Sequence, residues 1–102
     1  MKPETSNAAV RRSWRIFDLL SGRYFDGMSN KELAEAVGTS AVNISRDLAT
    51  LESIGMAHRM DNGRWGLTSR AIVPSQRFAQ QYETISHRMA EAHRSIMAGA
   101  AR

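Results

Sequence analysis

The side chains that could recognise a partner chemically are gathered between residues 40 and 64. In the first part of this segment they are small or hydrogen-bonding: Ser40, Ala41, Val42, Asn43, Ser45 and Arg46. Asparagine can pair with adenine, arginine with guanine or phosphate, and an exposed valine can touch the methyl group of thymine. Further on, three more polar residues could lie on a sugar-phosphate backbone or in a minor groove: Arg59, Asn62 and Arg64. These residue types are candidates for contact with double-stranded DNA.

A short capped helix is predicted just before this segment. Ser29 is a good N-cap, and Glu32 three residues later completes a capping box. Leu33 and Val37 lie on its apolar side, and Gly38 is a natural residue to end it.

A second helix follows, capped by Thr39 or Ser40 and stopped by Gly55. Its apolar residues recur at spacings of four, three and three, which marks a buried face: Ile44, Leu48, Leu51 and Ile54. Residues 40–46 then lie on the opposite face or at the N-terminal end, where backbone N–H groups favour phosphate. The alternative interpretation is the solvated face of an amphipathic helix.

Two short extended runs on either side of Asp61-Asn62-Gly63 predict a β-hairpin, because Asn-Gly is a strong turn signal. We expect Trp65 to anchor this hairpin on the core rather than to stack on bases. For Arg59 and Arg64, contact with nucleic acid and simple solvation both remain open. The order helix, turn, helix, hairpin is typical of a winged helix-turn-helix, whose second helix enters the major groove.

A helix is also predicted at the N-terminal side, beginning at Ala8 after residues 1–7, which we expect to be flexible. Its apolar face has four main residues, widened by two others: Val10, Trp14, Phe17 and Leu20, with Ile16 and Leu19. Three arginines on this helix could hold phosphate or be solvated: Arg11, Arg12 and Arg15.

The last predicted helix lies within residues 74–102, and Pro74 starts or kinks it. It carries a seam at coiled-coil spacing: Phe78, Tyr82, Ile85, Met89, Ala92 and Ile96. This seam could pack on the first helix or join a second copy. We favour a homodimer built from both helices through six residues: Trp14, Phe78, Tyr82, Ile85, Met89 and Ile96. Such a dimer would set two recognition helices about 34 Å apart on a pseudo-palindromic site.

Composition limits the other classes of function. The chain has 102 residues, about one domain, and its net charge of +4 favours an anionic partner. It has no cysteine, which excludes disulfides and thiolate metal sites. No run of about 18 apolar residues and no signal-like stretch is present, so we expect a cytoplasmic protein without membrane contact.

Nothing in the chain has the pattern of a catalytic centre. No two of the three histidines are four residues apart, and no glycine-rich phosphate loop is present. Glu83 and Glu91 each lie four residues from His87, which is typical of surface ion pairs on a helix. We therefore expect no enzymatic activity, no metal and no cofactor.

Residues 9–73 resemble the N-terminal DNA-binding domain of IclR-type transcriptional regulators. The matching stretches are RSWRIF (12–17), KELAEAVG (31–38), ISRDLATLESIG (44–55) and the hairpin DNGR (61–64). Arg46 and the Thr50-Leu51-Glu52 triplet fall where family members usually carry the same residues. The resemblance implies a DNA-binding fold and dimeric action. IclR-type regulators carry a long C-terminal effector domain, whereas this chain ends at Arg102, so a small-molecule effector is not expected.

The sequence thus predicts a mainly α fold with a small β-hairpin. Residues 8–73 would form a winged helix-turn-helix, and residues 74–102 a C-terminal dimerisation helix. The expected function is that of a sequence-specific transcriptional regulator of a bacterium or phage, a dimeric repressor. Two alternatives stay open. One is a protein-interaction module, for example a phage-encoded inhibitor, that keeps the fold without DNA binding, as modest charge and the acidic Asp47 suggest. The other is a nonspecific architectural DNA binder.

Overall fold

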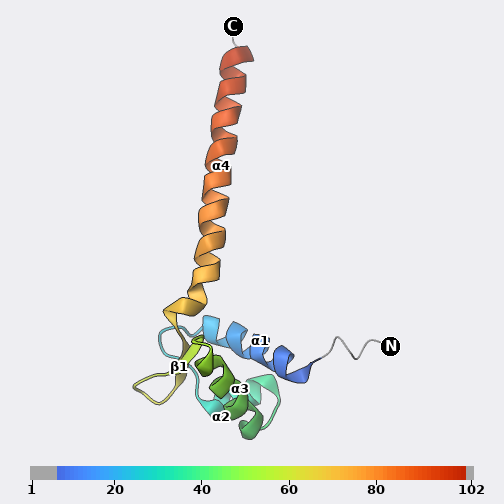
Figure 1. The fold of residues 1–102 in the computed structure, drawn as a ribbon, viewed down its shortest axis with the longest axis vertical. Helices are drawn as coiled ribbons and strands as arrows, with labels where there is room; N and C mark the ends of the chain where they lie inside the picture. The colour runs from blue at the N-terminus through green and yellow to red at the C-terminus, as the bar shows by residue number, and fades with distance from the viewer. Residues whose placement is uncertain (1–6, 101–102) are drawn as a thin grey trace, which may run out of the picture. The chain divides into compact units, whose positions relative to one another are not determined.

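The computed structural model describes residues 7–100, which contain four α-helices and one two-stranded antiparallel sheet (Figure 1). In chain order the elements are α1 (Ala8–Ser21), α2 (Asn30–Val37), α3 (Ala41–Ser53), β1 (Ala57–Arg59), β2 (Trp65–Leu67), the 3-10 turn η2 (Ser69–Ile72) and α4 (Val73–Ala100). The chain divides into two compact units, one ending at Ala71 and the other beginning at Ile72. The prediction of a mainly α chain with a small hairpin and a long C-terminal helix is confirmed.

The N-terminal stretch predicted to be flexible lies outside the described residues except for Asn7. Asn7 is the N-cap of α1, and its Oδ1 accepts the backbone N–H groups of Ala9 and Val10 at 3.0 and 3.1 Å. These bonds satisfy two of the N–H groups that a helix start leaves free.

Serine caps start both α2 and α3, which are joined by a short turn. The predicted capping box is confirmed, since Ser29 Oγ accepts from the Glu32 N–H at 3.1 Å and Glu32 Oε1 accepts from the Ser29 N–H at 2.9 Å. Of the two candidate caps for α3, Ser40 is the one used, and its Oγ accepts the Asn43 N–H at 3.1 Å. Gly38 ends α2 in the left-handed region with a φ of 81°, which glycine adopts without steric cost.

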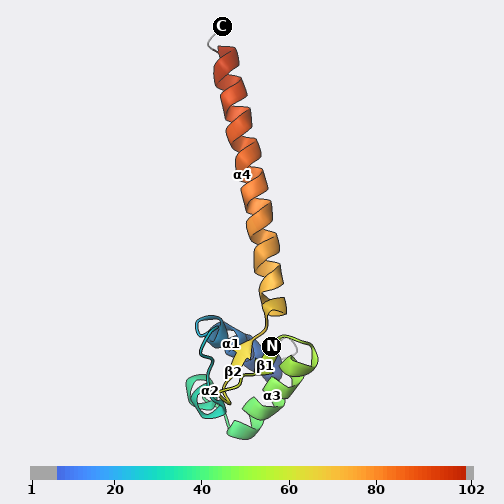
Figure 2. The same ribbon diagram turned by 90° about the vertical axis from the view of Figure 1, so that its left-hand side faces the viewer.

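The predicted hairpin is present as β1 and β2 (Figure 2), in which Ala57 lies opposite Leu67 and Arg59 opposite Trp65. Its turn contains Asp61-Asn62-Gly63, as the Asn-Gly signal indicated.

A bridge that no sequence signal indicated ties this hairpin to the loop between α1 and α2. The Met28 N–H donates to the Trp65 carbonyl at 2.9 Å, and the Trp65 N–H donates to the Met28 carbonyl at 2.8 Å. The preceding residue must be glycine, because a Cβ on Gly27 would lie 2.5 Å from the Trp65 carbonyl oxygen and 2.7 Å from Met60 Sδ. Trp65 therefore pairs with Arg59 of β1 on one side and with Met28 of the α1–α2 loop on the other.

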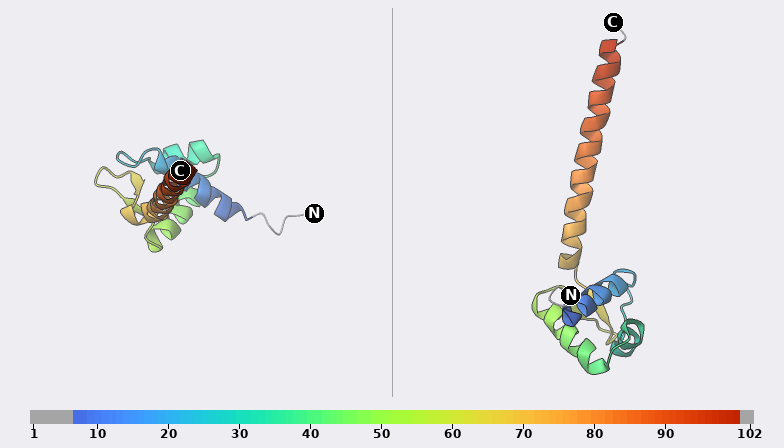
Figure 3. Two further views of the ribbon diagram at one scale, coloured as in Figure 1. Left: turned by 90° about the horizontal axis from the view of Figure 1, so that it is seen from above. Right: turned by 90° about the vertical axis from the view of Figure 1, so that its right-hand side faces the viewer.

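The core of the first unit lies where α1, α2, α3 and the hairpin meet, and Figure 3 shows these elements from two further directions. Its largest fully buried side chains are Ile16, Leu20, Leu33, Ile44, Leu48 and Leu67. They come from every α-helix of this unit and from β2, so removing any one element would open the core to water.

Two predicted apolar faces are partly wrong. On α1, Ile16 and Leu20 are buried, whereas Val10 is exposed and Trp14 is 67% exposed. The buried side of α1 is set by contact with α2, α3 and β2, and the widening residue Ile16 lies at its centre. On α3, Ile54 is exposed because the helix ends one residue earlier, so the helical period no longer applies.

The second unit consists of η2's last residue and α4, a single helix of 28 residues with no buried residue. It begins at Val73, one residue before the predicted start. Pro74 is its second residue, where the missing N–H is one of those left unpaired in any helix. Within residues 7–100, no helix combines the length and apolarity needed to cross a bilayer.

Candidate nucleic-acid interface

The exposed side of α3 carries a line of small side chains around one arginine. These residues, called the α3 face below, are Ala41, Val42, Ser45, Arg46 and Ala49. They are spaced so that they share one side of the helix, opposite the buried Ile44 and Leu48. Together with Asn30 of α2 they line a shallow hollow. Side chains this short allow the helix to approach another surface closely.

Arg46 is the cation of the α3 face. Its backbone carbonyl accepts from Thr50 Oγ1 at 3.1 Å. Its guanidinium has no hydrogen bond or ion pair to any residue that the structure describes. A guanidinium offers five N–H donors in a fixed fork, which matches a guanine edge or a phosphate.

Two other predicted DNA contacts already have partners within the protein. Asn43 Nδ2 donates to Thr39 Oγ1 at 2.9 Å, and this bond holds the turn before α3. Ser45 Oγ accepts from Asn30 Nδ2 at 2.8 Å, which fixes the start of α2 against α3. Both side chains therefore help to position α3, and Arg46 is the side chain of the α3 face that makes no side-chain hydrogen bond to a described residue.

One of the two acidic residues of α3, Asp47, is buried and does not lie on the α3 face, whereas the other, Glu52, is exposed. Asp47 is 5% exposed, and its carboxylate accepts from Arg12 Nε at 2.7 Å and from Arg12 Nη2 at 3.2 Å. The hydrogen bond to Asp47 raises the pKa of Arg12 above its ordinary value. The interpretation of Asp47 as a charge that opposes an anionic partner is thus not supported, because its charge is neutralised inside the fold.

The arginines of α1 differ in their availability. Arg12 is held by Asp47, and Arg15 Nη2 donates to the Ala36 carbonyl at 3.4 Å. Arg11 is exposed. Of the three, Arg11 is the side chain best placed to meet a phosphate.

The hairpin arginine predicted near the tip points inward. Arg64 Nε donates to the Asp26 carbonyl at 3.0 Å, and its Nη2 donates to the Gly27 carbonyl at 3.2 Å and to the Glu32 carboxylate at 2.5 Å. The Ser29 N–H, and then the charge of Arg64, lower the pKa of Glu32 below its ordinary value. Arg64 therefore clamps the hairpin to the α1–α2 loop and to α2.

Asn62 is also used in building the hairpin. Its Oδ1 accepts the Arg64 backbone N–H at 2.9 Å, and its Nδ2 donates to the Asp26 carbonyl at 3.4 Å. Asn62 is exposed to solvent. Its two side-chain hydrogen bonds nevertheless help to shape the turn.

Arg59 is the hairpin cation that lies beside α3. Its guanidinium carbon is 5.5 Å from the centre of the Trp65 ring, within cation–π distance. Both residues line a second hollow together with Asn30, Ser45, Leu48, Ala49 and Glu52. Trp65 is half-buried and packs against the core, so its predicted role as an anchor is confirmed.

Sequence reasoning missed three residues that line the hollows beside the α3 face: Asn30, Ala49 and Glu52. The helical period could have found Ala49, which lies four residues after Ser45 on the same side. No local signal could have found Asn30, because it reaches this surface from another helix.

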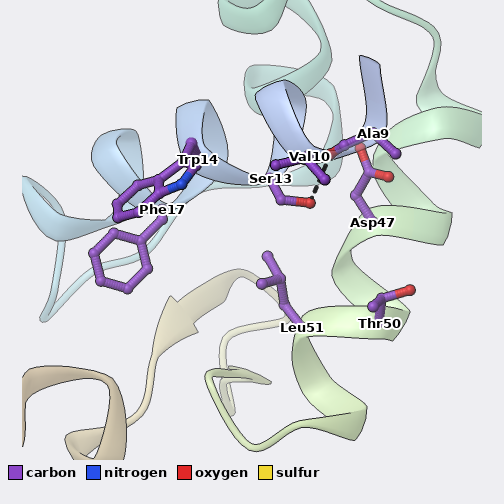
Figure 4. Close-up of a pocket in the computed structure, with 8 residues that line it drawn as sticks. All are labelled: Ala9, Val10, Ser13, Trp14, Phe17, Asp47, Thr50 and Leu51. Carbon is purple, nitrogen blue, oxygen red and sulfur yellow. Dashed lines mark hydrogen bonds between the residues drawn. The ribbon is translucent and has the colours of Figure 1, made fainter. Parts of the chain in front are cut away.

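The predicted dimerisation residue Trp14 lines an apolar groove between α1 and α3, shown in Figure 4. This α1 groove has a volume of about 360 Å³ and is lined by Ala9, Val10, Ser13, Trp14, Phe17, Asp47, Thr50 and Leu51. The rings of Trp14 and Phe17 meet edge to face, with centroids 5.6 Å apart. The Trp14 indole is not covered by any other element of the first unit.

The other predicted dimerisation residues are exposed on α4. The α4 seam consists of Phe78, Tyr82, Ile85, Met89, Ala92 and Ile96. Its five large side chains are between 56 and 68% exposed. Of the two predicted surface pairs of His87, the one with Glu91 is present as a contact of 3.3 Å from Nε2 to Oε1, and the one with Glu83 is not formed among the described residues.

Comparison with known proteins adds no assignment, since no family model, curated protein or solved structure matches the chain. Within the described residues there is no group of three or more histidine, aspartate and glutamate side chains that could hold a metal ion.

Proposed function

We propose that the chain is a sequence-specific transcriptional regulator that binds double-stranded DNA as a homodimer. The first unit would act as a winged helix-turn-helix of the kind found in IclR-type regulators, with α3 in the major groove and the hairpin as the wing. The observation that carries this proposal is the α3 face, where small side chains surround a guanidinium that has no partner among the described residues. A repressor in the cytoplasm of a bacterium, or one encoded by a phage, is the simplest protein of this kind.

The dimensions of α3 support insertion into the major groove. An α-helix is about 10–12 Å across, and the major groove of B-DNA is about 12 Å wide. Short side chains at Ala41, Val42 and Ala49 let the helix seat deeply, and the exposed Val42 can touch a thymine methyl. Arg46 would then reach a guanine edge.

Charge supports the same orientation. The burial of Asp47 against Arg12 removes one of the two acids of α3 from its surface, while Arg46 and Arg59 stay exposed. With Arg64 committed to Glu32, Arg59 becomes the proposed wing contact to the backbone or minor groove.

The proposed dimer uses the exposed apolar residues of the α4 seam, with Trp14 as a further contact. Two copies related by a two-fold axis would present two α3 helices to a pseudo-palindromic operator.

A selection from random duplex DNA, followed by fluorescence anisotropy on the recovered duplex, tests the proposal. We expect a pseudo-palindromic motif and binding that weakens with salt, by a log–log slope near −0.9 per phosphate contacted. Arg46→Ala should raise Kd for that duplex by roughly 5- to 150-fold and affect unrelated duplexes far less. Arg94→Ala removes the same charge from an exposed position of α4 and is the matched control.

Two outcomes of this experiment would contradict the proposal. Binding without an enriched motif would indicate a nonspecific architectural protein. Equal weakening of all duplexes by Arg46→Ala would make Arg46 a phosphate contact and remove its role in specificity.

The α1 groove favours a second candidate, a protein-interaction module of the same fold. Its exposed Trp14 and Val10 form an apolar surface that DNA binding through α3 would not use. This candidate predicts that Arg46→Ala combined with Arg59→Ala leaves the effect of the protein on host transcripts unchanged, whereas Trp14→Ala abolishes it. The opposite pattern would exclude it.

A further inference from the structure

The α4 seam is a continuous apolar face on a helix that buries no residue. Its five large side chains expose on the order of 600 Å² of surface per chain, given that an aromatic residue alone can bury roughly 150–250 Å². Two such faces together reach roughly 1,200 Å², the lower limit for a stable specific interface. A second copy of α4 could therefore bury enough surface against the α4 seam to form a stable interface.

The spacing of the seam assigns each residue to a coiled-coil position. Phe78, Ile85 and Ala92 take the d positions, while Tyr82, Met89 and Ile96 take the a positions. This assignment allows the layers of a parallel pair and of an antiparallel pair to be compared directly.

A parallel pair would place each residue against itself. Tyr82 would face Tyr82 in one layer, and Ala92 would face Ala92 in another, so an overfilled layer and an underfilled one would occur in the same short interface. Parallel dimers favour β-branched residues at a and leucine at d, whereas here the central d residue is Ile85.

An antiparallel pair fills its layers evenly. With the two-fold axis at His87, Phe78 faces Ile96 of the second copy, Tyr82 faces Ala92, and Ile85 faces Met89. Each layer then combines a larger side chain with a smaller or more flexible one, and every seam residue has a partner. The dipoles of the two helices also oppose each other, which is the favourable arrangement.

We propose that two copies of the chain pair through α4 in antiparallel orientation, in the register that sets Tyr82 of one copy against Ala92 of the other. This pairing specifies the homodimer on which the proposed function rests. Because α4 rises about 1.5 Å per residue, the two Val73 residues would lie about 42 Å apart along the helix axes. The DNA-binding units would then be attached at opposite ends of the helix pair.

Cysteine crosslinking of the full-length chain tests the orientation, since the natural sequence contains no cysteine. The double variant Tyr82→Cys/Ala92→Cys would be oxidised mildly and digested with trypsin, which cleaves after Arg88 between the two sites. We expect a disulfide that links residues 78–88 of one copy to residues 89–94 of the other. Within one chain these cysteines are about 15 Å apart along the helix and cannot bridge.

The single variant Ala92→Cys keeps Tyr82 and serves as the second measurement. It should form no covalent dimer in the antiparallel pair, whereas a parallel pair would yield a 92–92 disulfide. Homotypic disulfides in either variant, or a monomer by light scattering of the unmodified protein at about 100 µM, would overturn the proposal. An antiparallel dimer that binds no DNA would contradict the proposed function and leave the α4 pairing intact.

Discussion

Arg12 and Asp47 join α1 to α3 through two hydrogen bonds, 2.7 Å from Nε to Oδ2 and 3.2 Å from Nη2 to Oδ1. The two residues are 35 positions apart in the chain. The Asp47 carboxylate is buried and is not part of the exposed α3 face. This ion pair both fixes the position of α3 and keeps a negative charge away from its exposed side.

Removing the acid of this pair should destabilise the first unit, because the half-buried Arg12 guanidinium would lose its only carboxylate partner among the described residues. We expect Asp47→Ala to lower Tm by roughly 10 °C. Thermal unfolding followed by circular dichroism measures the change. Asp18→Ala removes an exposed acid from α1 and should leave Tm within about 2 °C. Equal effects of the two substitutions would mean that net charge, rather than the ion pair, sets the stability.

The two hairpin arginines should separate stability from binding. Arg64→Ala removes three hydrogen bonds from the hairpin and is expected to lower Tm by about 5–10 °C. Arg59→Ala removes an exposed cation and should instead weaken binding to the selected duplex, with little change in Tm. Thermal unfolding and anisotropy on both variants give the comparison. A large loss of Tm in Arg59→Ala would contradict its assignment to the binding surface.

The ionised carboxylate of Glu32 should contribute to stability in a defined range of pH. Its folded pKa lies below the ordinary value of 4.5, so this contribution is fully present above about pH 4.5 and is lost as the pH falls through the folded pKa. The difference in unfolding free energy between the natural protein and Glu32→Gln should therefore be largest near pH 7 and shrink below pH 4.5. Urea unfolding at a series of pH values measures it.

Glu35→Gln is the control for this pH series, since Glu35 is exposed on the same helix. It should change the unfolding free energy at pH 7 by less than about 0.5 kcal/mol. A Glu32→Gln difference that stays constant from pH 7 to pH 3 would mean that the carboxylate charge makes no contribution.

The end of α3 offers a test of which apolar residues form the core. Leu48 is fully buried, so Leu48→Ala should cost about 2–5 kcal/mol of unfolding free energy. Ile54 has a similar side chain but is exposed after the helix end, so Ile54→Ala should cost less than about 1 kcal/mol. Urea unfolding of both variants measures the two costs. If Ile54→Ala lowered the unfolding free energy as much as Leu48→Ala, Ile54 would belong to the core.

Local chemistry made much of the first unit predictable. The capping box of Ser29 and Glu32, the turn at Gly38 and the Asn-Gly hairpin each depend on residues at most a few positions apart. Helical periodicity likewise placed Ile44, Leu48 and Leu51 in the core. Such signals are read from short windows of sequence, so they need no knowledge of the tertiary fold.

The remaining features depend on contacts between distant segments. The pairs Arg12–Asp47 and Arg64–Glu32 join residues 35 and 32 positions apart. A charged residue on a helix or near a turn is usually solvated, so the sequence favours a surface position for both arginines. The buried side of α1 was misplaced for the same reason, since it is defined by what packs against the helix.

The α3 face has a consequence for redesign. Val42, Arg46 and Ala49 make no contribution to the core, and the caps and ion pair that position α3 lie elsewhere on the helix. Exchanging these side chains should therefore cost little folding free energy. A library randomised at the three positions would consist mostly of folded proteins, so new target preferences could be selected without compensating changes in the scaffold.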